Sequence, residues 1–178
     1  MKILCVNAGS SSLKFQLYDM PAEISIISGY VEKIGAPDSF YTIKYEGKKT
    51  ETVKPIKDHT EAAKIMLEEL VNYGAVKDLE EIRGVGHRVL HGGEKYAKSV
   101  VIDEQVLKDI KDLTKLGPLH HPGNIAGIKA MQKALPNATQ VAVFDTAFHQ
   151  TIPKVQFMYP VPMAWYEKYH AISLFFMK

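Results

Sequence analysis

The stretch Val6-Asn7-Ala8-Gly9-Ser10-Ser11-Ser12-Leu13-Lys14-Phe15 sets a turn of small residues between two short apolar runs near the start of the chain. A compact apolar run precedes the turn, and after it apolar side chains alternate with polar ones, as in a half-buried strand. The sequence therefore predicts a β-hairpin. Its turn combines Gly9 and three hydroxyl groups with Asn7 and Lys14, and such groups together suit an anion. A phosphate cradle is one interpretation, and a polar turn without a ligand is the other.

Length and composition are those of a globular protein. The chain has 178 residues, of which 46% are hydrophobic and 24% charged, so it can bury a sizeable core. A net charge of +2 gives no reason to expect nucleic acid or an anionic membrane as a partner. Cys5 is the only cysteine, which fits a cytoplasmic protein, and its apolar surroundings predict a buried side chain. Neither export nor membrane spanning is expected, because Met1-Lys2 leads straight into a predicted strand without a long apolar h-region, and no later apolar run approaches the length of a spanning helix.

Hydrophobic periodicity along the rest of the chain predicts an α/β fold. We expect a mixed five-stranded sheet with helices on both faces and a peripheral β-hairpin. Asp58 and Asp103 each precede a helical pattern and are expected to cap it. The expected strands are 3–6, 13–18, 24–34, 82–90 and 141–144, the hairpin is 39–53, and the helices are 59–73, 104–116 and 125–135.

Two charged residues fall at the ends of the last two predicted strands. Arg88 lies near the end of strand 82–90, and Asp145 directly follows strand 141–144. Ligands of open α/β sheets gather at such strand ends, and an arginine there suits a carboxylate or phosphate. The alternatives are a structural ion pair, with Asp145 itself as one possible partner for Arg88, and a capping role for Asp145.

Histidines and glycine motifs limit the kinds of ligand site that the sequence predicts. His87, His91, His120 and His121 have neither cysteine partners nor the helical spacing of a zinc site, so no structural zinc is expected. His91 and His120 fall in predicted loops and could donate a hydrogen bond to a ligand. Neither the P-loop motif nor the Rossmann glycine motif is present, which leaves a hairpin cradle as the candidate phosphate site.

Four blocks of sequence, in order, resemble signatures of the acetate and propionate kinase family, within the superfamily of sugar kinases, actin and Hsp70-type ATPases. The resemblance covers roughly residues 2–170, and the second block points away from butyrate kinases. The blocks are Asn7-Ala8-Gly9-Ser10-Ser11-Ser12-Leu13-Lys14, Gly86-His87-Arg88-Val89-Leu90-His91-Gly92-Gly93, Pro118-Leu119-His120 with Pro122 and Asn124, and Phe144-Asp145-Thr146-Ala147-Phe148-His149.

The resemblance implies a ribonuclease H-like, actin-like ATPase domain that acts in the phosphorylation of acetate to acetyl phosphate by ATP with Mg²⁺. Propionate kinase, or a non-catalytic phosphate- or nucleotide-binding fragment, is the alternative. By the same resemblance, Asp145, Arg88 and His120 would be catalytic, Arg88, Leu90 and Leu119 would bind the carboxylate, Lys14, Ser10 and Ser12 would bind ATP phosphates, and Asn7 would lie at the magnesium site.

The resemblance also implies that the chain corresponds to the N-terminal part of such an enzyme. We expect one domain at residues 1–151 and the start of a truncated second domain at 152–178, where the tail Ser173–Lys178 departs from the family pattern. The rest of the enzyme would carry the adenine pocket, a second transition-state arginine, a magnesium-ligating glutamate and the surface of a homodimer. On this basis the 178-residue chain alone is expected to be inactive.

Overall fold

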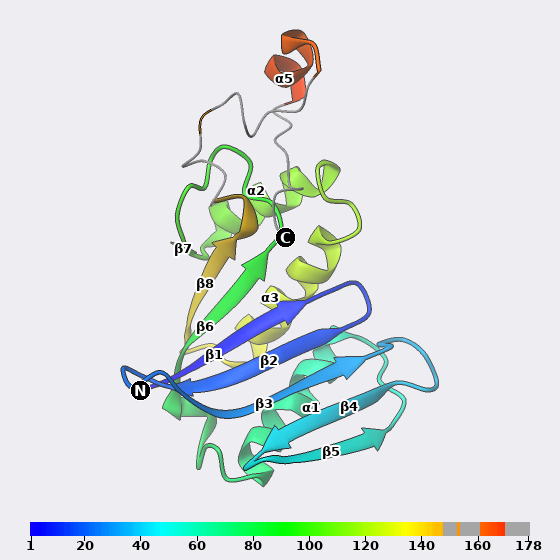
Figure 1. Ribbon diagram of the computed structural model, residues 1–178, viewed down its shortest axis with the longest axis vertical. Coiled ribbons are helices and arrows are strands. Elements are labelled where there is room, and N and C mark those ends of the chain that lie inside the picture. The colour runs from blue at the N-terminus through cyan, green and yellow to red at the C-terminus, as the bar shows by residue number, and fades with distance from the viewer. Residues whose placement is uncertain (148–152, 154–160, 170–178) are drawn as a thin grey trace.

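An eight-stranded mixed sheet is the frame of the computed structural model, which describes residues 1–147, 153 and 161–169 (Figure 1). The strand order is β5-β4-β3-β2-β1-β6-β8-β7, in which β1, β6 and β8 are parallel neighbours and the other pairs are antiparallel. The strands are β1 (Lys2–Ala8), β2 (Leu13–Asp19), β3 (Ile24–Glu32), β4 (Phe40–Tyr45), β5 (Lys48–Val53), β6 (Ile82–Val89), β7 (Val100–Val101) and β8 (Thr139–Phe144).

The predicted opening hairpin is present as β1 and β2. Asn7 pairs with Lys14, and Ala8 pairs with Leu13, so the small residues 9–12 form the turn. The backbone N–H of Gly9 closes this turn by donating to the carbonyl oxygen of Ser12 at 2.8 Å. Asn7 and Lys14 therefore lie opposite each other at the mouth of the turn.

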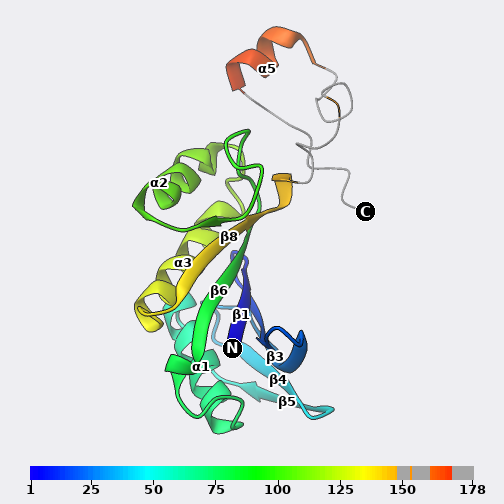
Figure 2. The ribbon, with the colours of Figure 1, turned by 90° about the vertical axis from the view of Figure 1, so that its left-hand side faces the viewer.

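One face of the sheet carries α1 (His59–Asn72), α2 (Glu104–Asp112) and α3 (His121–Ala134), as Figure 2 shows. Leu4, Val6 and Ala8 of β1 point to that face and are buried. The expectation of helices on both faces is thus wrong for residues 1–147. The helical segments are α1 (His59–Asn72), η1 (Leu79–Glu81), α2 (Glu104–Asp112), η2 (Leu113–Lys115), α3 (His121–Ala134) and α5 (Met163–Tyr169).

Cys5 lies on the opposite, open face and is exposed, contrary to the prediction that it is buried. Side chains alternate between the two faces of a strand, so Cys5 faces away from the helices that cover its neighbours Leu4 and Val6. An apolar run in the sequence does not reveal which of the two sheet faces is covered. The same alternation brings Asn7 to the open side of β1.

The predicted number of strands was too small, although the mixed α/β class is confirmed. The hairpin formed by β4 and β5 is not separate, because β4 pairs with β3 and continues the sheet. A two-residue strand, β7, also pairs with β8 at the other edge. A strand of two residues is too short to give a hydrophobic period, so the sequence carried no signal for it.

The two predicted helix caps are confirmed. The Asp58 carboxylate accepts from the backbone N–H groups of Thr60 and Glu61, each at 2.9 Å, and Asp103 accepts from Val106 at 2.7 Å. α3 begins at His121, four residues before the expected start, because Pro122 is accommodated in a first helical turn. This earlier start moves residues 121–124 from an expected loop into the helix end that faces the β1–β2 turn.

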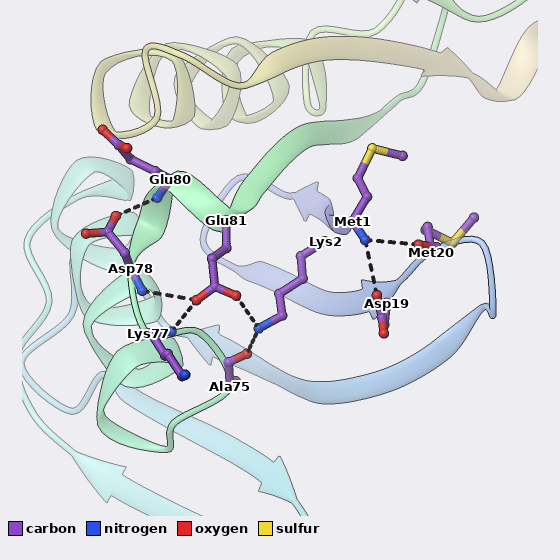
Figure 3. A network of polar contacts seen from close by, with 9 residues as sticks. All are labelled: Met1, Lys2, Asp19, Met20, Ala75, Lys77, Asp78, Glu80 and Glu81. Atoms are coloured by element: carbon purple, nitrogen blue, oxygen red, sulfur yellow. Dashed lines mark hydrogen bonds and ion pairs between the residues drawn. The ribbon is translucent and has the colours of Figure 1, made fainter.

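A polar network fixes the start of β1 to the segment before β6 (Figure 3). Lys2 Nζ donates to the Ala75 carbonyl oxygen at 2.6 Å and to Glu81 Oε2 at 2.8 Å. Glu81 Oε1 also accepts from the Lys77 backbone N–H at 2.6 Å. The hydrogen bond from Lys2, assisted by those from the backbone, lowers the pKa of Glu81 from 4.5 to about 2.

The proposed domain boundary between residues 151 and 152, and the tail Ser173–Lys178, lie outside the described residues. Residues 163–169 form α5, where the sequence left helix and strand open. None of the helices in the described part of the chain is both long and apolar enough to cross a bilayer.

Candidate phosphate and carboxylate site

The carboxyl ends of three adjacent parallel strands bring the candidate residues together. β1 ends with Asn7 and Ala8, β6 ends one residue after Arg88, and Asp145 directly follows β8. The register pairs Arg88 with Val143 of β8, so Asp145 comes two residues later along the neighbouring strand. This edge of an open α/β sheet is where ligands usually bind.

Arg88 and Asp145 form a bidentate ion pair. Arg88 Nε lies 3.0 Å from each Asp145 carboxylate oxygen, and one terminal guanidinium nitrogen lies 2.7 Å from Oδ2. The Asp145 side chain is 11% exposed, but that of Arg88 is 50% exposed. The pair therefore fixes the plane of the guanidinium while leaving half of its surface open to an anion.

A cavity of about 210 Å³ lies between this arginine and the β1–β2 turn. Several predicted site residues line it, but Ser10 and Leu119 do not, and the Leu119 side chain is 77% exposed. Asp145 reaches the cavity only through Arg88. The lining residues are Asn7, Ala8, Gly9, Ser12, Lys14, Arg88, Leu90, His120 and Asn124.

A second, wider cavity of about 350 Å³ continues onto the open face of the sheet. It shares Asn7, Lys14 and Arg88 with the first and extends past Cys5 and Val143. The two cavities form one groove that runs from the turn across β1 and β6. Its shared residues supply two cations, so the electrostatics favour an anionic ligand.

The turn itself is supported by the first part of α3. A Cβ atom at Gly123 would lie 2.4 Å from the Gly9 carbonyl oxygen, and one at Gly127 would lie 2.5 Å from the Ala8 Cβ. These distances are below any normal contact, so only glycine permits α3 to approach the turn this closely. The cradle backbone is therefore held against a helix.

Two residues that the sequence analysis did not assign to the site contact the same turn. Asn124 Nδ2 donates to the Ala8 carbonyl oxygen at 2.7 Å, and His59 Nε2 lies 2.7 Å from the Gly9 carbonyl oxygen. Asn124 belongs to the third sequence block, which could have drawn attention to it. His59 is 50 positions from its partner, and no local pattern could have revealed that contact.

The other histidines have structural surroundings. Burial lowers the pKa of His87, which hydrogen-bonds Gln140 Oε1 at 2.8 Å. Burial likewise lowers the pKa of His121, whose Nδ1 lies 2.8 Å from the Ile110 carbonyl oxygen. His91 Nδ1 accepts from the Gly93 backbone N–H at 2.8 Å. Of the four histidines considered, His120 is the one that lines the 210 Å³ cavity.

The donor set suits magnesium bound mainly through phosphate. Mg²⁺ prefers oxygen ligands, retains several waters and usually takes few ligands from the protein. The cavity offers the Asn7 amide and the Ser12 hydroxyl, whereas both oxygens of Asp145 are engaged by Arg88. Within the described ranges, no group of three His, Cys, Asp or Glu residues is arranged to hold a metal ion by itself.

Two solved structures, of an acetate kinase and a propionate kinase, share this fold. The crystal structure of Porphyromonas gingivalis acetate kinase matches with a TM-score of 0.90 and 41% identity, over 96% of this chain and 44% of that one. A propionate kinase from Francisella tularensis matches with a TM-score of 0.88 and 36% identity, over 97% and 44% of the two chains. The mixed sheet with its helices thus has the fold of these kinases and is consistent with an actin-like domain.

The family follows from the sequence comparison. The model of the Acetokinase family matches residues 2–174, and the chain belongs to this family. Acetate kinases of Bacillus cytotoxicus and Bacillus subtilis are 55% and 52% identical to it over 168 residues. Those residues are 94% of this chain but only 42% of each relative, so the chain spans less than half of their length.

Proposed function

We propose that this chain supplies the phosphate and carboxylate sites of an enzyme that transfers a phosphoryl group reversibly between ATP and acetate. The observation that carries the proposal is the half-exposed Arg88, held by Asp145, facing Asn7 and Lys14 across one cavity of about 210 Å³. Arg88, as the cation for the carboxylate, and the β1–β2 turn, as the cradle for the phosphates, thus line the same cavity. The acetate kinases among the relatives support the same reaction.

The reaction needs positioning and neutralisation of charge more than proton transfer. Acetate is already ionised near neutral pH, so Asp145 orients Arg88 and is not required as a base. In this proposal Arg88 binds the acetate carboxylate and offsets charge in the transition state. His120 donates to the transferred phosphoryl group, and Leu90 contacts the methyl group. Leu119 points elsewhere in this chain, so its exposure argues against the same role.

The cradle takes the ATP phosphates. Lys14 and Ser12 line the cavity, and the exposed Ser10 lies at the tip of the same turn. Magnesium, when bound to the phosphates, would neutralise their charge, and the Asn7 amide oxygen would be its ligand from this chain. We further propose that the whole protein is a cytoplasmic homodimer whose remaining part completes the site, with neither nucleic acid nor membrane as a partner.

Propionate is the second candidate substrate, because the Francisella tularensis structure with a TM-score of 0.88 is a propionate kinase. Assays that supply acetate or propionate separately would distinguish the two. A higher kcat/KM for propionate would reassign the substrate without changing the site.

The test is trapping of acyl phosphate as its hydroxamate. The 178-residue chain with ATP, Mg²⁺ and acetate should remain at the no-enzyme blank, while a protein that continues beyond Lys178 at the length of the relatives should form acetyl hydroxamate. Turnover by the 178-residue chain would show that it contains the whole site. A longer protein that binds ATP yet forms no hydroxamate from acetate or propionate would support the non-catalytic alternative.

A further inference from the structure

Asn124 connects two of the strand ends that form the candidate site. Its side chain is only 6% exposed and lies in the first turns of α3. Nδ2 donates to the Ala8 carbonyl oxygen at 2.7 Å, and Oδ1 accepts from the Leu90 backbone N–H at 3.3 Å. One amide group thus joins the end of β1 to the residues just beyond β6.

These two contacts flank the groups proposed to bind ligand. Ala8 directly follows Asn7 and begins the phosphate turn, while Leu90 comes two residues after Arg88. A buried amide that donates on one side and accepts on the other has one favourable orientation, because reversing it would oppose two acceptors and two donors. Asn124 therefore fixes the spacing between the β1–β2 turn and the end of β6, which carries Arg88.

The bond to Ala8 also orients the turn itself. The C=O and N–H groups of a trans peptide point in opposite directions, so holding the Ala8 carbonyl sets the direction of the Gly9 N–H. That N–H closes the turn on Ser12 at 2.8 Å. His59 holds the next carbonyl, Gly9, at 2.7 Å and so directs the Ser10 N–H away from α1. Two consecutive peptide planes are fixed by side chains from two helices.

We propose that Asn124 is a positioning residue, which sets the geometry of the phosphate turn relative to Arg88 without taking part in the transfer. This inference rests on the proposed function, because it takes the phosphate turn and Arg88 to be ligand-binding groups whose spacing affects binding. It predicts that loss of the amide lowers affinity for a phosphate ligand in a chain that remains folded.

The experiment compares Asn124→Leu and Asn124→Asp with the wild-type 178-residue chain, using pyrophosphate as the probe. Asn137→Asp, at an exposed residue in the turn before β8, is the matched control for added charge. Asn124→Leu has nearly the same shape and no charge. With far-UV circular dichroism unchanged, its Kd for pyrophosphate should rise about tenfold, the factor expected for loss of one positioned hydrogen bond. A Kd within about twofold of wild type would overturn the inference.

Asn124→Asp tests whether affinity for pyrophosphate can be rescued. This measurement also tests the inference if Asn124→Leu does not fold. An ionised carboxylate cannot donate to Ala8, whereas a protonated one can. Its affinity relative to wild type should therefore recover as pH falls through the pKa of the new carboxyl group, and Asn137→Asp should show no such recovery. A ratio that stays constant with pH would contradict a positioning role.

Backbone amide NMR of the ligand-free chains separates this inference from the proposed function. The Gly9 and Ser10 resonances should shift in Asn124→Leu, or in Asn124→Asp at neutral pH, relative to wild type, and unchanged resonances would overturn the inference. If wild type itself fails to bind pyrophosphate, the proposed phosphate site is wrong, while those resonances still decide whether Asn124 orients the turn.

Discussion

Arg88 combines two properties that usually exclude each other, a fixed orientation and a half-exposed cationic surface. The bidentate contact with Asp145 restricts the guanidinium to one plane, so less conformational entropy is lost when a carboxylate binds. Asp145 is itself mostly covered, at 11% exposure. Arg88 therefore presents the cationic surface, and Asp145 holds it in one plane. Substitution of either residue tests its own contribution.

Arg88→Ala and Asp145→Asn should each lower kcat/KM for acetate by about a hundredfold or more in the longer protein, the range found when one charge-stabilising group is removed. Arg83→Ala, at an exposed arginine near the other end of β6, is the control and should leave kcat/KM unchanged. Steady-state hydroxamate assays at several acetate concentrations give kcat and KM for each variant. Near-normal kcat/KM in Arg88→Ala would remove this residue from the mechanism.

Glu81 gives a residue-scale prediction about stability. Its folded-state pKa of about 2 lies below the ordinary 4.5, so ionised Glu81 stabilises the fold above about pH 4.5, and this contribution is lost as pH falls towards 2. Glu81→Gln should lower the thermal midpoint near neutral pH and make it less sensitive to acid over that range. Glu80→Gln is the control, because Glu80 joins the network of Figure 3 only through its backbone. Parallel pH dependence in wild type and Glu81→Gln would refute the assignment.

At the scale of elements, the contact between α3 and the β1–β2 turn links the fold to the site. Two glycines one helical turn apart, Gly123 and Gly127, bring the helix onto residues 8 and 9 of the turn. A helix usually gains stability when glycine is replaced by alanine. At these two glycines the close approach should have the opposite effect, so that alanine lowers the stability of the fold.

Gly127→Ala should destabilise the chain by about 1–3 kcal/mol, because the new methyl group meets the Ala8 Cβ at 2.5 Å and α3 must shift. Urea unfolding followed by circular dichroism measures the change. Lys129→Ala on the exposed side of α3 controls for helix propensity and should change stability by less than about 0.5 kcal/mol. Equal or greater stability of Gly127→Ala would mean that the helix and the turn are not in contact.

Local signals in the sequence predicted elements better than their arrangement. The hairpin, the caps at Asp58 and Asp103 and the strand ends at Arg88 and Asp145 follow from patterns within a few residues, and the structure contains all of them. The earlier start of α3 at His121 was missed because Pro, Gly and Asn together resemble a loop. The covered face of the sheet was missed because it depends on which elements pack across it.

The site was predictable to a similar extent. Asn7 and Lys14 could be grouped because they flank one predicted turn, and the family resemblance added Arg88 to them. The three residues do line one cavity. Asn124 and His59 could not be assigned from local patterns, since their contacts join residues 116 and 50 positions apart. Leu119 was grouped by resemblance alone, and its side chain points into solvent.

At the scale of the whole molecule, one face of the sheet carries α1, α2 and α3 (Figure 2). The residues that line the groove lie on the other face. Cys5 lies on this open face, where partial burial raises the pKa of its thiol. Its accessibility therefore reports directly on whether the face is open in solution.

The native 178-residue chain should react with DTNB at Cys5 without denaturant, and the rate should rise steeply with pH because the raised pKa leaves little thiolate near neutrality. Absorbance of the released thiolate measures the reaction, and Cys5→Ser is the blank. A thiol that reacts only in denaturant would show that something covers this face in solution.

The same cysteine offers a natural attachment point for an optical label. It is the only thiol in the chain and lies two residues from Asn7 along β1, on the same face and so about 7 Å away. A small environment-sensitive fluorophore attached there would lie in the open-face part of the groove rather than inside the phosphate turn. Occupancy of the cradle could then be followed as a change in emission, without introducing a residue that the protein does not already have.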